Sequence, residues 1–137
     1  MRLLSVFLRT LLPLYAVVIG WLSLAPVSGE GLPWDKALHF VAYSGFAGLL
    51  LPWTRARTAR LLPLGTAVLV YSALLELAQH SVPGRSMDGW DLLANGLGIT
   101  VGLGCCWLFL RVASDTLRCW VCGVSPETGQ TNPGQSV

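Results

Sequence analysis

Residues 10–29 read TLLPLYAVVIGWLSLAPVSG and contain no charged side chain. A helix needs about 20 mostly apolar residues to cross a hydrocarbon core about 30 Å thick, so this stretch is long enough to span a membrane. The composition of the whole chain agrees, because 53% of its 137 residues are hydrophobic and 12% are charged, whereas soluble domains carry about 25% charged residues. We therefore expect a protein embedded in lipid rather than a water-soluble domain.

Three further windows have membrane length and few charged side chains: residues 37–54 with His39, residues 61–82 with Glu76 and His80, and residues 92–110 with none. Lipid offers no hydrogen-bond partners to the backbone, and no segment alternates like a barrel strand, so the spanning segments should be helices. We predict an all-α, polytopic membrane protein with one membrane domain over residues 1–111. Its compact bundle should contain four transmembrane helices, at about residues 8–27, 36–52, 61–82 and 91–111.

The first window admits a second interpretation as a signal peptide, with Arg2 and Arg9 as its basic flank. Pro26 fits poorly with cleavage after Ala25, and the apolar core of a signal peptide is usually about 7–15 residues long, shorter than this window. We therefore expect the first helix to be retained in the protein.

The arginines predict how the protein is oriented. The short connector at residues 53–60 contains three of them, and a positive excess in a short loop marks the cytoplasmic side. Four spans then place both termini in the cytoplasm of a bacterium and the chain, as a multi-pass protein, in its cytoplasmic membrane. The two connectors that face outward collect the acidic side chains Glu30, Asp35, Asp88 and Asp91.

Small residues at one-turn spacing predict where helix backbones approach each other. Ala94, Gly98 and Gly102 recur at i, i+4 and i+8 in the fourth window, and Ser44 and Gly48 share a face in the second. The alternative interpretation is that glycines are simply common in spanning helices.

Polar side chains gather near the outer ends of three predicted helices, and Glu76 is the most informative of them. A carboxylate inside the bilayer costs about 2.5–3.5 kcal/mol, so Glu76 should face the bundle and find a partner. We predict one outward-facing polar pocket, able to hold an anionic head group, to transfer protons or to bind a divalent cation. Its residues are Asp35, Lys36, His39, Tyr43, Glu76, Gln79, His80, Arg85, Asp88, Asp91 and Asn95.

A structural role for the same residues is the alternative. Asp35, Asp88 or Asp91 could each do no more than cap a helix. The charges could also form an internal ion network that pins the helices together, with Arg85 bonded to Asp88 or Glu76 and Lys36 bonded to Asp91.

The order and spacing of these residues resemble those of the VanZ-like family of small bacterial membrane proteins. The resemblance runs through DKALHFVAY at residues 35–43, ELAQ at 76–79, PGRSMD at 83–88 and DLLANGLG at 91–98. It implies a four-helix integral membrane protein of the cell envelope, and the family's namesake is associated with resistance to the glycopeptide teicoplanin. The resemblance implies no catalytic residue.

Three functions remain open on these grounds. The leading one is binding of an anionic membrane lipid or a lipid-linked envelope precursor, with Arg85 and Lys36 meeting phosphate. The second is a small intramembrane hydrolase or transferase acting on a lipid phosphate or sugar, with His39 or His80 as general base. The third is a structural subunit of an envelope complex. The sequence indicates no cofactor, no bound metal and no nucleic-acid partner, and it leaves catalytic activity undecided.

Residues 112–137 are polar, and we expect a disordered cytoplasmic tail there. The tail contains one CxxC sequence, Cys119-Trp-Val-Cys122. A single CxxC could be half of a zinc ribbon, a redox pair or a sequence without a role, and on the cytoplasmic side its thiols should be reduced.

Overall fold

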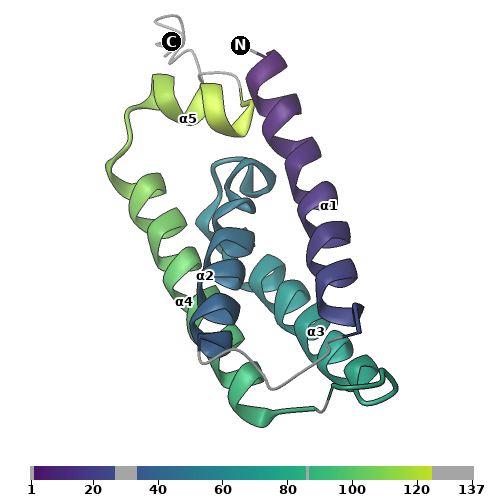
Figure 1. Ribbon diagram of the computed structural model, residues 1–137. Helices are drawn as coiled ribbons and strands as arrows, with labels where there is room; N and C mark the ends of the chain where they lie inside the picture. The colour runs from purple at the N-terminus through teal and green to yellow at the C-terminus, as the bar shows by residue number, and fades with distance from the viewer. Residues whose placement is uncertain (1, 27–33, 86, 125–137) are drawn as a thin grey trace, which may run out of the picture.

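A computed structural model describes residues 2–26, 34–85 and 87–124 (Figure 1). Every element in these ranges is helical, and no strand occurs in them. Glu30 and residues 125–137, to which the sequence analysis assigned roles, lie outside the described ranges. The α-helices are α1 (Arg2–Leu24), α2 (Asp35–Gly48), α3 (Leu61–Gln79), α4 (Gly89–Val112) and α5 (Asp115–Cys122), and the 3₁₀-helices are η1 (Leu51–Thr54) and η2 (Thr58–Arg60).

Three of the helical segments are long and apolar enough to cross a membrane: Leu3–Leu24, Thr58–Gln79 and Gly89–Val112. Large apolar side chains stay exposed along them, among them Val17, Leu74 and Leu97. Water would penalise so much exposed apolar surface, which indicates a membrane-embedded protein. The prediction of spanning helices is therefore confirmed for three of the four.

The remaining predicted span, residues 36–52, is shorter in the structure. Helix α2 ends at Gly48 after 14 residues, which at 1.5 Å per residue is about 21 Å. Pro52 explains this end, because a proline ring clashes with the carbonyl four residues earlier and provides no N–H group for a helical hydrogen bond. Helix α3 likewise ends at Gln79, four residues before Pro83, rather than at residue 82.

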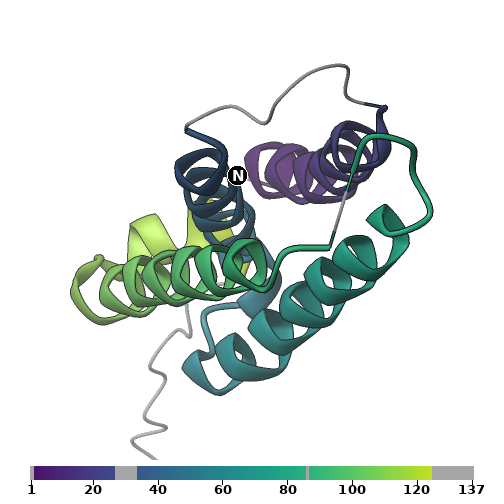
Figure 2. The same cartoon turned by 60° about the horizontal axis from the view of Figure 1, so that its bottom comes forward.

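Helix α2 packs most extensively against α4, and glycines make this approach possible (Figure 2). A Cβ atom added to Gly98 would collide with the carbonyl oxygen of Phe40, and one added to Gly102 with that of Ser44. A Cβ atom at Gly104, on another face of α4, would meet no atom within 4 Å. The predicted close approach is thus confirmed at Gly98 and Gly102.

Aromatic side chains join α1, α2 and α3 in the core. The ring of Phe46 makes edge-to-face contacts with Tyr15 at 5.6 Å and with Tyr71 at 5.7 Å between centroids. The two tyrosine hydroxyls also cross between helices, since Tyr15 donates to the carbonyl of Ala42 and Tyr71 to that of Ala16. These bonds satisfy polar groups that lipid could not.

The described part of the tail differs from the expected disorder. Residues 115–122 form α5, which lies across the ends of α1 and α4 (Figure 1). Its buried cysteines, Cys119 and Cys122, point into the molecule, and Arg9 donates to the carbonyl oxygen of Cys122 at 2.7 Å. This segment folds because its helix has one apolar face, which the polar composition of the tail as a whole does not reveal. Ser114 caps the start of this helix, and Gly123 ends it with φ of +65°.

Candidate functional site

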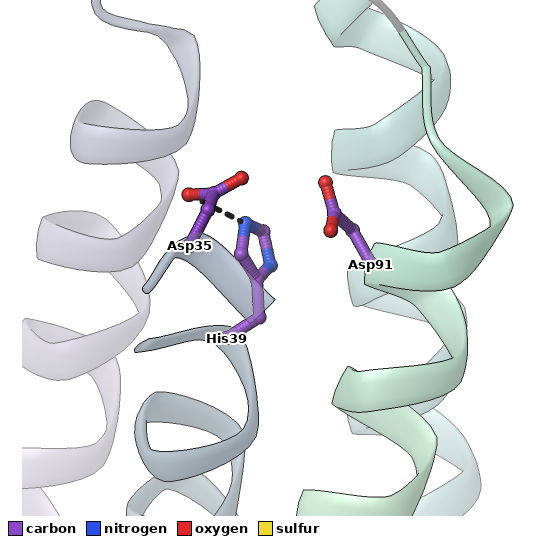
Figure 3. Close-up of side chains that lie close together, drawn as sticks. All are labelled: Asp35, His39 and Asp91. Carbon is purple, nitrogen blue, oxygen red and sulfur yellow. Dashed lines mark ion pairs between the residues drawn. The ribbon is translucent and has the colours of Figure 1, made fainter. Parts of the chain in front are cut away.

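Most of the predicted pocket residues meet where α2 begins, α3 ends and α4 begins. Figure 3 shows Asp35 and His39, both on α2, facing Asp91 on α4. The predicted coincidence of three segments distant in the sequence is present in the fold, and the individual contacts divide it into smaller groups.

Lys36 bridges the start of α2 to the start of α4. Its Nζ atom lies 2.6 Å from Oδ2 of Asp88 and 2.9 Å from Oδ1 of Asp91. Asp88 also caps α4, because its side chain accepts from the backbone N–H of Trp90 at 2.9 Å. The Lys36 ammonium, and then this N–H, lower the pKa of Asp88 below its ordinary value. Of the predicted ion network, the bond between Lys36 and Asp91 is therefore observed.

A buried hydrogen-bond chain centres on Asn95. Its amide nitrogen donates to Ser72 Oγ at 2.8 Å and to Glu76 Oε1 at 3.5 Å, and its oxygen lies 3.0 Å from His39 Nδ1. Asn95 and Ser72 are fully buried, and Glu76 is 4% exposed. Since both amide hydrogens face acceptors, the Asn95 oxygen is free to accept, and His39 Nδ1 is its donor. The polar network therefore fixes the orientation of the His39 ring.

Asp35, His39 and Asp91 form a tighter group, which we call the Asp–His–Asp cluster. Each offers one ligand atom, and these atoms all lie within 4.8 Å of one another. Oδ1 of Asp35 is 3.8 Å from Nε2 of His39, the nitrogen that faces away from Asn95. Carboxylate oxygens and an imidazole nitrogen are donors that divalent cations accept.

Gln79 and Arg85 contact α1 instead of the cluster. Gln79 donates to the carbonyl oxygen of Ser23 at 3.0 Å, and Arg85 donates to those of Leu22 at 2.9 Å and Ala25 at 3.0 Å. The last carbonyls of a helix have no partners within it, so these side chains satisfy the end of α1. The bond of Arg85 to Asp88 or Glu76, considered as an alternative above, is replaced by these contacts.

The other two predicted residues differ in position: Tyr43 lies inside the bundle near Ser72 and Glu76, and His80 lies at the surface. Tyr43 is 3% exposed and packs in the aromatic core, with its ring 6.0 Å from that of Phe46. His80 is exposed at the end of α3. The structure thus brings Tyr43 beneath the cluster and leaves His80 outside it.

A groove of about 560 Å³ runs between α1 and α2. Arg85, Asp35 and His39 contribute polar groups, and Tyr15, Ser23 and Tyr43 contribute hydroxyls. The remaining lining is apolar and consists of Val18, Ile19, Leu22, Leu38, Val41 and Ala42. The groove therefore combines apolar walls with charged groups, as an amphipathic ligand requires.

Ser72 is the functional candidate that the sequence analysis missed. It lies one turn before Glu76 on the same face of α3, and this i, i+4 spacing could have identified it. The carbonyl acceptors on α1 had no comparable signal, because backbone groups carry no sequence information.

A comparison with known protein families agrees with the family resemblance that the order and spacing of the polar residues suggested. The family model described as VanZ/LLP1 matches residues 4–110, which include α1 to α4 almost completely. No curated protein and no solved structure matches the chain. Because the match covers well over half of the sequence and includes all three long apolar helices, the chain belongs to the VanZ/LLP1 family.

Proposed function

We propose that this VanZ-like protein binds an amphipathic ligand with an anionic head group, a membrane lipid or a lipid-linked envelope precursor, in the groove between α1 and α2. The observation that carries the proposal is the lining of this groove, in which Arg85 accompanies apolar side chains of two membrane-facing helices. Membrane lipids have the same division into a charged head and an apolar chain.

The apolar walls suit an acyl or prenyl chain. Val18, Leu38 and Val41 line the groove and are 42%, 55% and 65% exposed, so they are accessible to a hydrocarbon that enters from the bilayer. Burial of hydrocarbon against such side chains contributes favourable packing without any specific polar contact.

Arg85 suits the head group. A guanidinium has five N–H donors, and the contacts to Leu22 and Ala25 use two of them. The others can form charge-assisted hydrogen bonds with a phosphate, whose oxygens match the planar arrangement of the donors. Lys36 is less suited than the sequence suggested, since it is already bonded to Asp88 and Asp91.

The proposal includes four membrane-embedded segments with both termini in the cytoplasm. Arg55, Arg57 and Arg60 lie in the connector at one end of the bundle, whereas Asp35, Asp88 and Asp91 lie at the other. This charge distribution favours an inward arginine end and an outward polar end. The short helix α2 would cross together with η1, with one face packed against α4.

Mass spectrometry of lipids retained by the purified protein tests the proposal. Val18→Trp should fill the groove and lower the amount of retained anionic lipid several-fold. Val17→Trp is the matched control, because Val17 is 69% exposed on the same helix and does not line the groove. Equal lipid retention by the two variants at unchanged melting temperature would refute binding in this groove.

The family resemblance adds a phenotype. Expression of the wild-type chain should raise the teicoplanin concentration that a susceptible host tolerates, and Val18→Trp should remove this increase while Val17→Trp keeps it. If the tolerated teicoplanin concentration stays raised in Val18→Trp, resistance does not depend on the groove.

A further inference from the structure

We propose that the Asp–His–Asp cluster binds a divalent transition-metal ion, with Asp35 and Asp91 as oxygen ligands and Nε2 of His39 as nitrogen ligand. Each of the three residues offers a ligand atom, these atoms lie within 4.8 Å of one another, and the residues belong to two helices, α2 and α4, that pack tightly. Two carboxylates and one imidazole leave further positions of the ion open for water or for another ligand. The inference does not depend on lipid binding.

The orientation of His39 supports this role. Its Nδ1–H donates to the oxygen of Asn95 at 3.0 Å, which leaves the lone pair of Nε2 directed away from Asn95. In the neutral imidazole, Nε2 then holds a lone pair 3.8 Å from Oδ1 of Asp35. Metal-binding histidines are commonly oriented by a hydrogen bond of this kind from the other ring nitrogen, and a cation would satisfy both groups.

Glu76 supplies an independent observation. Its side chain is 5% exposed, and Oε1 lies 3.9 Å from Nδ1 of His39, so the carboxylate lies beside the ring of this cluster residue, on its Nδ1 side. Its other oxygen, Oε2, is buried and has no hydrogen-bond partner within 3.5 Å among the described residues, and the backbone N–H of Asp88 is a neighbour of this carboxylate. A buried carboxylate oxygen without a donor calls for a nearby positive charge.

The surrounding charges also favour a cation. Four carboxylates meet here, those of Asp35, Glu76, Asp88 and Asp91. Among the described residues, Lys36 is the one ammonium bonded to any of them, and it bonds Asp88 and Asp91. Lys36 bonds Oδ1 of Asp91, which leaves Oδ2 for an ion, and it can keep its shorter bond to Asp88. A divalent ion would reduce the excess of negative charge that one lysine cannot balance.

Manganese is the suitable probe, because Mn²⁺ accepts carboxylate and imidazole and is not selected by the thiols of the four cysteines. The full-length protein in detergent, freed of metal by a chelator, is titrated with Mn²⁺, and the free ion is followed by electron paramagnetic resonance. We expect one ion per chain, with a nitrogen coupling from His39 in the pulsed spectrum.

Two variants and two matched controls decide the outcome. His39→Gln and Asp35→Asn should weaken Mn²⁺ affinity about tenfold or more, whereas the exposed His80→Gln and Asp115→Asn should bind like the wild type. Asp35 is 44% exposed on its side chain, so Asp35→Asn should stay folded even if His39→Gln does not. Absence of stoichiometric binding to the wild type, or equal affinity in Asp35→Asn and Asp115→Asn, would overturn the site and leave His39 as part of an internal ion network.

Discussion

Arg85 shows how one side chain can serve both structure and binding. It fastens the loop after α3 to the last turn of α1 through the carbonyls of Leu22 and Ala25, and it also lines the groove. From the sequence alone, the loss of Arg85 would be expected to affect binding and not folding. Because Arg85 also bonds α1, its loss should lower stability as well.

Arg85→Ala should therefore lower the free energy of unfolding by about 2 kcal/mol, since a hydrogen bond from a charged donor contributes about 1.5–3 kcal/mol and this side chain is partly exposed. Arg85→Lys should recover less than half of the loss, because one ammonium cannot reproduce the fork that reaches two carbonyls. Thermal unfolding in detergent measures both. Arg57→Ala, in the exposed connector at the opposite end, is the control and should leave stability unchanged. A wild-type melting temperature in Arg85→Ala would show that these bonds contribute nothing.

Among the elements, the pair α2 and α4 determines the geometry of the site. His39 and Asn95 can meet only because the two backbones approach at Gly98 and Gly102, a turn or two below. In a membrane, such close packing replaces the hydrophobic effect as the force that holds helices together.

Gly98→Ala or Gly102→Ala should destabilise the protein by about 1–3 kcal/mol, because the added methyl group meets backbone oxygen atoms that cannot move independently of α2. Gly104→Ala should be neutral or stabilising, since its methyl group meets open space and alanine favours a helix by about 1 kcal/mol over glycine. Melting temperatures of the three variants provide the comparison. If Gly98→Ala and Gly104→Ala have the same melting temperature, the close approach of α2 and α4 does not require glycine at position 98.

Helix α5 joins the tail to the membrane domain. Its buried Cys122 packs with Leu61, Cys106 and Leu110, and its last carbonyl accepts from Arg9. The sequence analysis treated this part of the tail as polar and disordered.

Truncation after Ser114 should lower the melting temperature, because it uncovers this apolar cluster and removes one of the two carbonyl acceptors of Arg9. Truncation after Val124 is the control, because it keeps α5 and its contacts with the other described helices, and it should melt like the full chain. The two truncated proteins are compared by thermal unfolding in the same detergent. Equal melting temperatures of the two truncated proteins would show that α5 does not stabilise the membrane helices.

At the scale of the whole molecule, the two ends of the bundle differ in charge. The connector with Arg55, Arg57 and Arg60 joins α2 to α3, whereas Asp35 at the far end of α2 lies close to Asp91 at the start of α4. This asymmetry is the basis of the proposed orientation.

Arg57→Cys and Met87→Cys test the orientation in intact cells with a maleimide that does not cross membranes. Both positions are exposed, and they lie at opposite ends of α3. Met87→Cys should react from outside, and Arg57→Cys should react only after the cells are permeabilised. The unsubstituted protein provides the background from its own cysteines. Labelling of Arg57→Cys from outside would reverse the orientation and place the groove's polar end in the cytoplasm.

The sequence by itself determined the apolar helices and the set of polar residues at one end of the bundle. It could do so because uncharged windows of membrane length and i, i+4 spacings are local properties of the chain. The predicted end of the second helix at residue 52 was too late, because a proline disturbs the helix up to four residues earlier and α2 ends at Gly48.

Only the tertiary structure decided which partner each polar side chain has. Arg85 binds backbone oxygens of α1, and Asn95 joins His39 to Ser72 and Glu76. These choices depend on the distances between helices, which result from the packing of glycines and aromatic rings far along the chain. A carbonyl oxygen at a helix end is the same in every residue, so the sequence cannot show which side chain will reach it.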